Sequence, residues 1–98
     1  MSNYEYKEFN FNKDIKKIIA KNIRKYRKEK GYTQEQLALY TDRSFEFIRR
    51  IESEEGRRGF SVETLWRIAT VLEINMDKLF KEDWKNRKIL FLFFAFTS

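Results

Sequence analysis

The sequence predicts an all-α fold of five short helices. Apolar residues between positions 15 and 80 recur at the three- and four-residue spacing of an amphipathic helix, and the middle of the chain shows almost none of the two-residue alternation of a strand. A serine or threonine stands before three of the helical segments, where its hydroxyl can accept a hydrogen bond from a free backbone amide. The short connections between the segments are typical of a locally connected bundle.

The first predicted helix covers residues 14–30. Gly31 follows it and can end the helix, because glycine enters the left-handed backbone conformation without steric cost. The apolar side chains of this segment form a single stripe, which we expect to face the core: Ile15, Ile18, Ile19, Ile23 and Tyr26.

Two shorter helices come next. Thr33 is expected to cap a helix over residues 34–40, with Gln36 in the capping-box position. Ser44 is expected to cap a third helix that covers residues 45–54. The positions with the spacing to hold these two helices together are Leu37, Ala38, Ile48 and Ile51.

The last two predicted helices follow a loop over residues 55–60 that contains two of the three glycines. Ser61 is expected to cap the fourth helix, residues 62–73, and the fifth covers residues 76–81. The side chains that we expect these two helices to bury are Leu65, Ile68, Ala69, Leu72, Leu79 and Phe80.

The two ends of the chain differ from this helical middle, residues 13–82. Residues 1–12 form an aromatic arm that contains Tyr4, Tyr6, Phe9 and Phe11, and residues 83–98 form a hydrophobic tail. Both are too apolar to remain in solvent. We expect them to form a short β-arm or a dimer contact, or to cover the core of their own subunit.

Composition excludes several classes of function. The 98 residues suffice for one domain, and the absence of cysteine and histidine removes disulfides, thiolate metal sites and the usual general acid–base group. No catalytic residue, metal or cofactor is therefore expected, and an enzyme is the least favoured class. The longest apolar run, residues 89–96, is far shorter than the roughly 20 residues of a spanning helix. With no secretory signal pattern, we expect a cytoplasmic protein without a membrane partner.

The positive charge is concentrated in the first helix. The net charge is +6, and the segment from residue 13 to residue 30 carries nine lysines or arginines against two acidic residues. A basic balance favours a polyanionic partner but does not separate DNA, RNA and an anionic membrane surface. The alternative is a solvated helix face with no partner.

Residues 33–52, TQEQLALYTDRSFEFIRRIE, carry the strongest functional signal. Two short helices joined by a tight turn are what reading of the DNA major groove requires, because the groove, about 12 Å wide, admits a single helix. The small side chain of Ala38 lets the two helices approach closely. The segment therefore predicts a helix-turn-helix that binds double-stranded DNA.

The same segment resembles the Cro/CI family of bacterial and phage repressors, and the similarity extends over residues 23–80. The residues that carry the resemblance in the central segment are Thr33, Gln34, Glu35, Leu37, Ala38, Ile48, Ile51 and Glu52. The resemblance implies a five-helix, lambda-repressor-like domain. It also implies a sequence-specific transcription regulator that binds a palindromic operator as a homodimer.

Three positions depart from the family pattern. Asp42 stands where glycine is usual in the turn, and aspartate tolerates a positive φ better than most side chains. Arg43 replaces a buried Val or Leu, and it is expected to extend its stem over the surface or to reach a phosphate. The loop over residues 53–60 is longer than usual, with Phe60 in place of the typical proline.

The resemblance implies that the start of the third helix reads bases, through Phe45, Glu46, Arg49 and Arg50. Arginine can donate two bonds to guanine, glutamate can accept from cytosine, and phenylalanine can pack on a thymine methyl group. Alternatives remain open: Arg50 can contact a phosphate or pair with Glu46, and Glu46 can stabilise the helix dipole. Phe47 is expected to pack at the edge of the helix pair.

The family also implies contacts to the DNA backbone, and Gln34 stands where the family holds a phosphate. The residues that we expect to contact the backbone are Thr33, Gln34, Arg43, Ser44, Ser53, Arg57 and Arg58. For the hydroxyl side chains the alternative is capping, and for the two loop arginines it is solvent exposure. Arg27 and Glu52 resemble the family's structural ion pair.

The expected function is that of a dimeric repressor or a restriction-modification controller-like regulator. One alternative is an antitoxin-type interaction module whose hydrophobic tail binds a partner protein, with DNA binding for autoregulation. A protein that lies on a membrane surface through its basic helix and its Phe-rich end is a further alternative.

Overall fold

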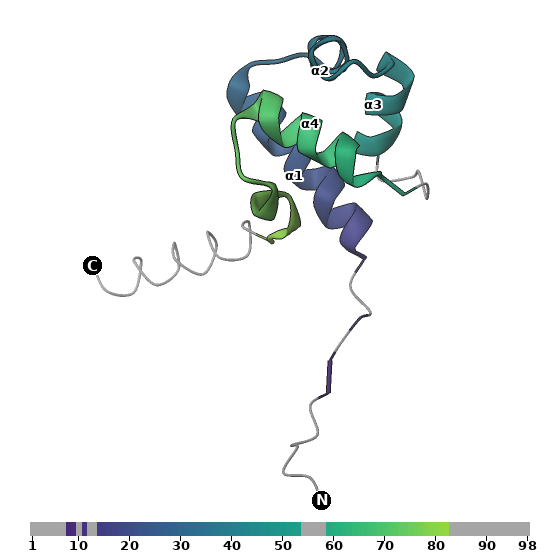
Figure 1. The fold of residues 1–98 in the computed structure, drawn as a ribbon, viewed down its shortest axis with the longest axis vertical. Helices are drawn as coiled ribbons and strands as arrows, with labels where there is room; N and C mark the ends of the chain where they lie inside the picture. The colour runs from purple at the N-terminus through teal and green to yellow at the C-terminus, as the bar shows by residue number, and fades with distance from the viewer. Residues whose placement is uncertain (1–7, 10, 12–13, 54–58, 83–98) are drawn as a thin grey trace, which may run out of the picture.

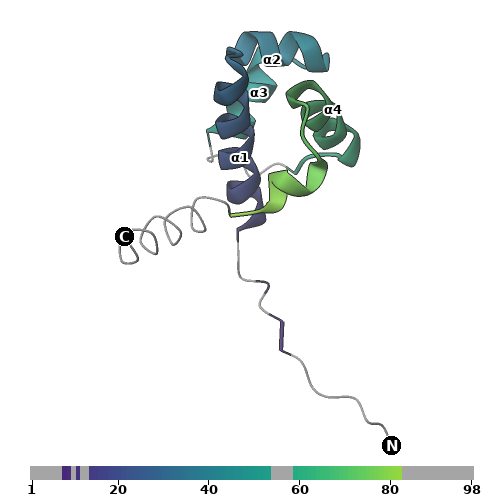
Figure 2. The same cartoon turned by 90° about the vertical axis from the view of Figure 1, so that its left-hand side faces the viewer.

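The computed structural model describes residues 8–9, 11, 14–53 and 59–82, and these residues form four α-helices and one 3₁₀ helix. The helices are α1 (Ile15–Lys30), α2 (Gln34–Thr41), α3 (Phe45–Glu52), α4 (Val62–Leu72) and η1 (Met76–Phe80). In Figure 1, α2 lies at the top of the bundle and Met76–Phe80 at the opposite end, and the turned view in Figure 2 shows the same order. Helix α1 contacts α3, α4 and η1, while α2 packs on α3 and α4.

Helix α1 ends at Gly31 as predicted, and it begins one residue later than predicted because Asp14 caps it. The Asp14 side chain accepts a hydrogen bond from the Lys17 amide at 3.3 Å, and Gly31 closes the helix in the left-handed conformation at φ 76°. The predicted apolar stripe is buried only from the second turn onwards. Ile19, Ile23 and Tyr26 are in the core, whereas Ile15 is 44% exposed.

One core joins all the helices, and η1 contributes Leu79 to it. Each of the short helices buries one side and exposes the other, as the helical period of the sequence requires. The predicted core positions of α2, α3 and α4 are all buried: Leu37, Ala38, Ile48, Ile51, Leu65, Ile68, Ala69 and Leu72. Phe47 is partly buried and packs against this core.

The fifth predicted helix forms as a five-residue 3₁₀ helix, η1, so a count of five α-helices is not confirmed. Asn75 precedes it without a side-chain capping bond, and a segment this short forms few of the i to i−4 bonds that favour the α form. The prediction that Phe80 is buried is wrong. The 3₁₀ geometry turns Leu79 inward and leaves Phe80 42% exposed.

No strand occurs in the part of the chain that the structure describes. Phe9 and Phe11 stack on each other with their ring centroids 6.2 Å apart, and both are largely exposed. Tyr4, Tyr6 and residues 83–98 lie outside the described residues, so the expected β-arm and tail contacts remain predictions. None of the helices in the described ranges has the length and hydropathy needed to cross a membrane.

Two non-glycine residues end helices in the left-handed conformation. Asp42 ends α2 at φ 56°, as the sequence allowed, and Glu73 ends α4 at φ 57°. Lys30 donates a hydrogen bond to the Glu73 carboxylate at 2.7 Å. This bond lowers the pKa of Glu73 and joins the end of α1 to the end of α4.

Candidate nucleic-acid interface

Helices α2 and α3 form a capped pair joined by a tight turn. The amide of Asp42 donates to the Leu39 carbonyl at 3.2 Å, and the amide of Arg43 donates to the Ala38 carbonyl at 2.9 Å. These two bonds satisfy carbonyls that would otherwise be free at the end of α2. The chain therefore changes direction between Asp42 and Ser44, which caps α3.

Helix α3 has a buried side and an exposed side. Ile48 and Ile51 point into the core at 0% and 8% exposure. The exposed residues form what we call the α3 outer face: Phe45, Glu46, Arg49 and Arg50. Phe45 is 41% exposed, so part of its ring is open to a ligand.

Charges on the α3 outer face pair with one another. Arg49 Nη2 lies 3.0 Å from Glu46 Oε2, and Arg50 Nη2 lies 4.0 Å from the same oxygen. All three side chains are about half exposed or more, so these ion pairs are screened by water and are weak. The arginines can exchange Glu46 for another acceptor at little cost.

Arg27 and Glu52 join α1 to α3 through a buried ion pair. Arg27 Nε lies 2.7 Å from Glu52 Oε2, and Nη2 lies 2.9 Å from Oε1, with the two side chains 10% and 2% exposed. Arg27 also donates to the Tyr32 carbonyl at 2.7 Å. The amide nitrogen of Gln34 donates to Glu52 Oε1 at 3.1 Å, so α2 is tied to the same carboxylate.

Beside this pair lies an open hollow of about 370 Å³ at the junction of α1, α2 and α3. Its lining contains three arginines and one glutamate, so its charge is positive. The lining residues are Arg24, Arg27, Gln34, Arg49, Glu52 and Ser53. Sequence reasoning did not select Arg24, although its position three residues before Arg27 places both on the same face of a helix.

The predicted backbone-contact residues with hydroxyl groups all bond within the protein. Thr33 forms the predicted capping box with Gln36, through bonds of 3.0 and 2.9 Å. Ser44 accepts from the Phe47 amide at 3.1 Å, and Ser53 donates to the Arg50 carbonyl at 2.9 Å. Arg57 and Arg58 lie outside the described residues.

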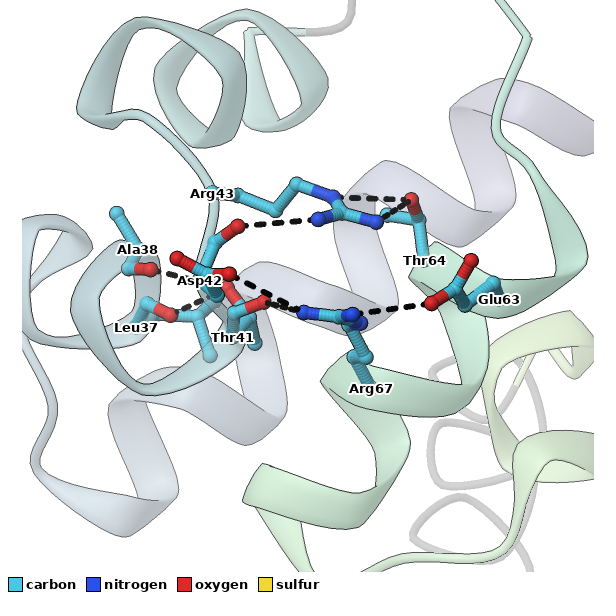
Figure 3. Close-up of polar contacts among 8 residues, drawn as sticks. All are labelled: Leu37, Ala38, Thr41, Asp42, Arg43, Glu63, Thr64 and Arg67. Atoms are coloured by element: carbon cyan, nitrogen blue, oxygen red, sulfur yellow. Dashed lines mark hydrogen bonds and ion pairs between the residues drawn. The ribbon is translucent and has the colours of Figure 1, made fainter.

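The guanidinium of Arg43, another predicted backbone contact, bonds within the protein. Its Nε and Nη2 donate to Thr64 Oγ1 at 3.3 and 3.2 Å, and its Nη1 donates to the Asp42 carbonyl at 3.0 Å (Figure 3). The guanidinium thus lies on the first turn of α4. Arg67, on α4, reaches Thr41 and Asp42 beside the turn between α2 and α3. The sequence analysis missed this residue because no local pattern links it to residues 41 and 42.

A family model described as helix-turn-helix, HTH_3, matches residues 23–79, which is more than half of the chain. The chain belongs to this helix-turn-helix family. The matched segment contains α2, α3 and α4 entirely and begins at Ile23, the buried centre of α1.

A curated member of this kind is similar to the chain over 62 residues. It is the uncharacterized HTH-type transcriptional regulator y4dJ of Sinorhizobium fredii, 32% identical, with 63% of this chain and 78% of the relative covered. This helix-turn-helix chain is therefore similar to a transcription regulator along most of that regulator's length.

Two solved helix-turn-helix structures share the fold. The restriction-modification controller C.AhdI of Aeromonas hydrophila is 26% identical at a TM-score of 0.61, with 66% of this chain and 96% of that chain covered. The biofilm regulator SinR, solved in complex with DNA, is 28% identical at a TM-score of 0.60, with coverages of 64% and 98%. Nearly the whole of each solved chain corresponds to the helical domain described above.

Proposed function

We propose that this chain is a transcription regulator that binds double-stranded DNA by inserting the α3 outer face into the major groove. The observation that supports this most is the exposure of Phe45, Glu46, Arg49 and Arg50 on a helix anchored from below by buried residues. A helix held by its inner side and capped at its start can present its N-terminal residues to base edges without losing order on binding.

The chemistry of the α3 outer face suits base reading. Arg49 and Arg50 offer forked donors for guanine, and Phe45 offers an apolar surface for a thymine methyl group. In the free protein Glu46 pairs weakly with both arginines. In the proposed complex Glu46 accepts from cytosine or continues to orient the arginines.

The open hollow beside the Arg27–Glu52 pair is the proposed place for a phosphate of the DNA backbone. Gln34 and Ser53 line it together with arginines, and its positive charge complements an anion. Thr33, Ser44, Arg57 and Arg58 remain proposed backbone contacts. A phosphate contact by Arg43 would require its guanidinium to leave Thr64.

A dimer is part of the proposal, because one helix reads too few base pairs for selectivity in a genome. Two copies would place two α3 helices on half-sites about 34 Å apart in a palindromic operator. The candidates for the dimer contact are residues 1–12 and 83–98. Similarity to C.AhdI favours a restriction-modification controller-like regulator. The alternative function is binding of a partner protein by the hydrophobic tail, residues 83–98.

Arg50→Ala is expected to relax base preference at one operator position and to weaken the selected site by about 1–3 kcal/mol, because one forked base contact is lost. Gln34→Ala is expected to weaken all sites about equally, because a phosphate contact carries no sequence information. Selection of sites from a random duplex pool, followed by binding measurements, distinguishes the two patterns.

Lys78→Ala is the matched control, since Lys78 is an exposed cation on η1, at the opposite end of the domain from α2. It should leave site preference unchanged. If Arg50→Ala and Gln34→Ala both keep the wild-type affinity and preference, the proposed contacts are wrong.

A further inference from the structure

Two arginines connect the turn between α2 and α3 to helix α4 (Figure 3). Arg43 belongs to the turn and donates to Thr64 on α4, while Arg67 belongs to α4 and reaches back to the turn. The two side chains cross the same interface in opposite directions. Neither belongs to the α3 outer face.

Arg67 contacts the last residue of α2 and the first residue of the turn at once. Its Nη1 donates to the Thr41 carbonyl at 3.1 Å and lies 3.7 Å from Asp42 Oδ2. Its Nη2 bonds to Glu63 Oε1 at 3.0 Å, one helical turn earlier on α4. The side chain is 31% exposed, so its stem is largely covered by protein.

The backbone conformation of the turn gives these contacts something to stabilise. Asp42 lies at φ 56° and ψ 48°, where the β-carbon of any residue except glycine is crowded against the following carbonyl. The Thr41 carbonyl stands at the end of α2, where no amide of the same helix can reach it. Arg67 satisfies that carbonyl and places a positive charge beside the Asp42 carboxylate.

We propose that Arg67 and Arg43 are positioning residues for DNA recognition, which fix the direction of α3 by clamping the left-handed turn at Asp42 to α4. The inference rests on the proposed function, and it names residues that act on DNA binding without touching DNA. Phe45 and Glu46 follow Asp42 by only a few residues, so a shift of the turn moves the α3 outer face directly. Contacts that specify a ligand tolerate errors of only about 0.5 Å.

The test uses Arg67→Met, which keeps an unbranched apolar stem and removes the charged head. Loss of its hydrogen bond to the Thr41 carbonyl and of its positive charge beside Asp42 is expected to weaken binding to the selected duplex about tenfold, as for the loss of a hydrogen bond to a charged group. Adding Asp42→Gly is expected to restore most of the affinity, because glycine adopts the left-handed conformation without help. Lys78→Ala controls for the loss of one positive charge.

Amide hydrogen exchange gives a readout that does not depend on DNA. The Arg43 amide, bonded to the Ala38 carbonyl at 2.9 Å, should exchange faster in Arg67→Met than in the unsubstituted chain. It should slow again in the double variant. Buried amides of α1 should keep their exchange rates, because neither Arg67 nor Arg43 bonds to α1.

Arg43→Met separates positioning from phosphate binding. If Arg43 only positions α3, the substitution lowers affinity and leaves unchanged the slope of the logarithm of the binding constant against the logarithm of the salt concentration. If a phosphate contact is lost, the magnitude of that slope falls by about one. A reduced slope would refute the role proposed for Arg43.

Three results would overturn the clamp: wild-type affinity in Arg67→Met, a loss of affinity that Asp42→Gly does not restore, or an unchanged exchange rate at Arg43. Failure of the unsubstituted chain to prefer any duplex would instead refute the proposed function, and the exchange measurement would still decide whether the turn is clamped.

Discussion

Glu52→Ala should destabilise the domain by about 3–5 kcal/mol, because it leaves the guanidinium of Arg27 buried without its carboxylate. The Glu52 side chain is 2% exposed and accepts both bonds of the ion pair, and it also accepts from Gln34. The whole free energy of unfolding of a small domain is only about 5–15 kcal/mol. Thermal unfolding at fixed protein concentration should show a melting temperature lowered by more than about 10 °C.

Glu46→Ala is the matched control, because Glu46 is an exposed carboxylate on the same helix and should change stability little. The double variant Arg27→Met with Glu52→Leu should recover much of the loss, because apolar residues of similar volume can replace a buried ion pair. A melting temperature for Glu52→Ala within a few degrees of the unsubstituted chain would contradict the account of this pair.

Ile48→Ala should cost about 2–5 kcal/mol, because Ile48 is fully buried and its removal leaves a cavity beneath α3. DNA binding should weaken as well, because Ile48 is one of the two buried apolar residues that pack α3 against the bundle. Chemical unfolding of the variant should show a lower midpoint concentration of denaturant, while the slope of the free energy of unfolding against denaturant concentration stays unchanged.

Leu39→Ala tests the same kind of truncation at an exposed site. Leu39 is 74% exposed on α2, so its loss should change stability by no more than about 0.5 kcal/mol. If Leu39→Ala proves as costly as Ile48→Ala, the assignment of inner and outer sides to α2 and α3 is wrong.

Local sequence patterns predicted the helices of the bundle well. Thr33, Ser44 and Ser61 each cap the helix that they precede, and Gly31 ends α1 as expected. The tolerance of Asp42 for positive φ was also predicted and is observed. These features depend on residues within a few positions of one another, so the sequence contains the information directly.

Features that depend on distant residues could not be predicted in the same way. Arg67 meets Thr41 across 26 positions of the chain, and no spacing rule connects them. Arg24 lines the open hollow because α1 packs beside α3, which sequence periodicity does not specify. Phe80 was expected in the core because apolarity alone does not distinguish an α-helix from the 3₁₀ turn that exposes it.

We propose that the exposed side of α3 is the surface that meets DNA. An amide chemical-shift titration of the full chain, with a duplex that the protein itself has selected, locates that surface residue by residue. The largest changes should occur at Gln34 and at residues 44–50, with Met76–Phe80 unaffected. Changes concentrated on η1 while residues 44–50 stay constant, or equal responses to selected and scrambled duplexes, would contradict this proposal.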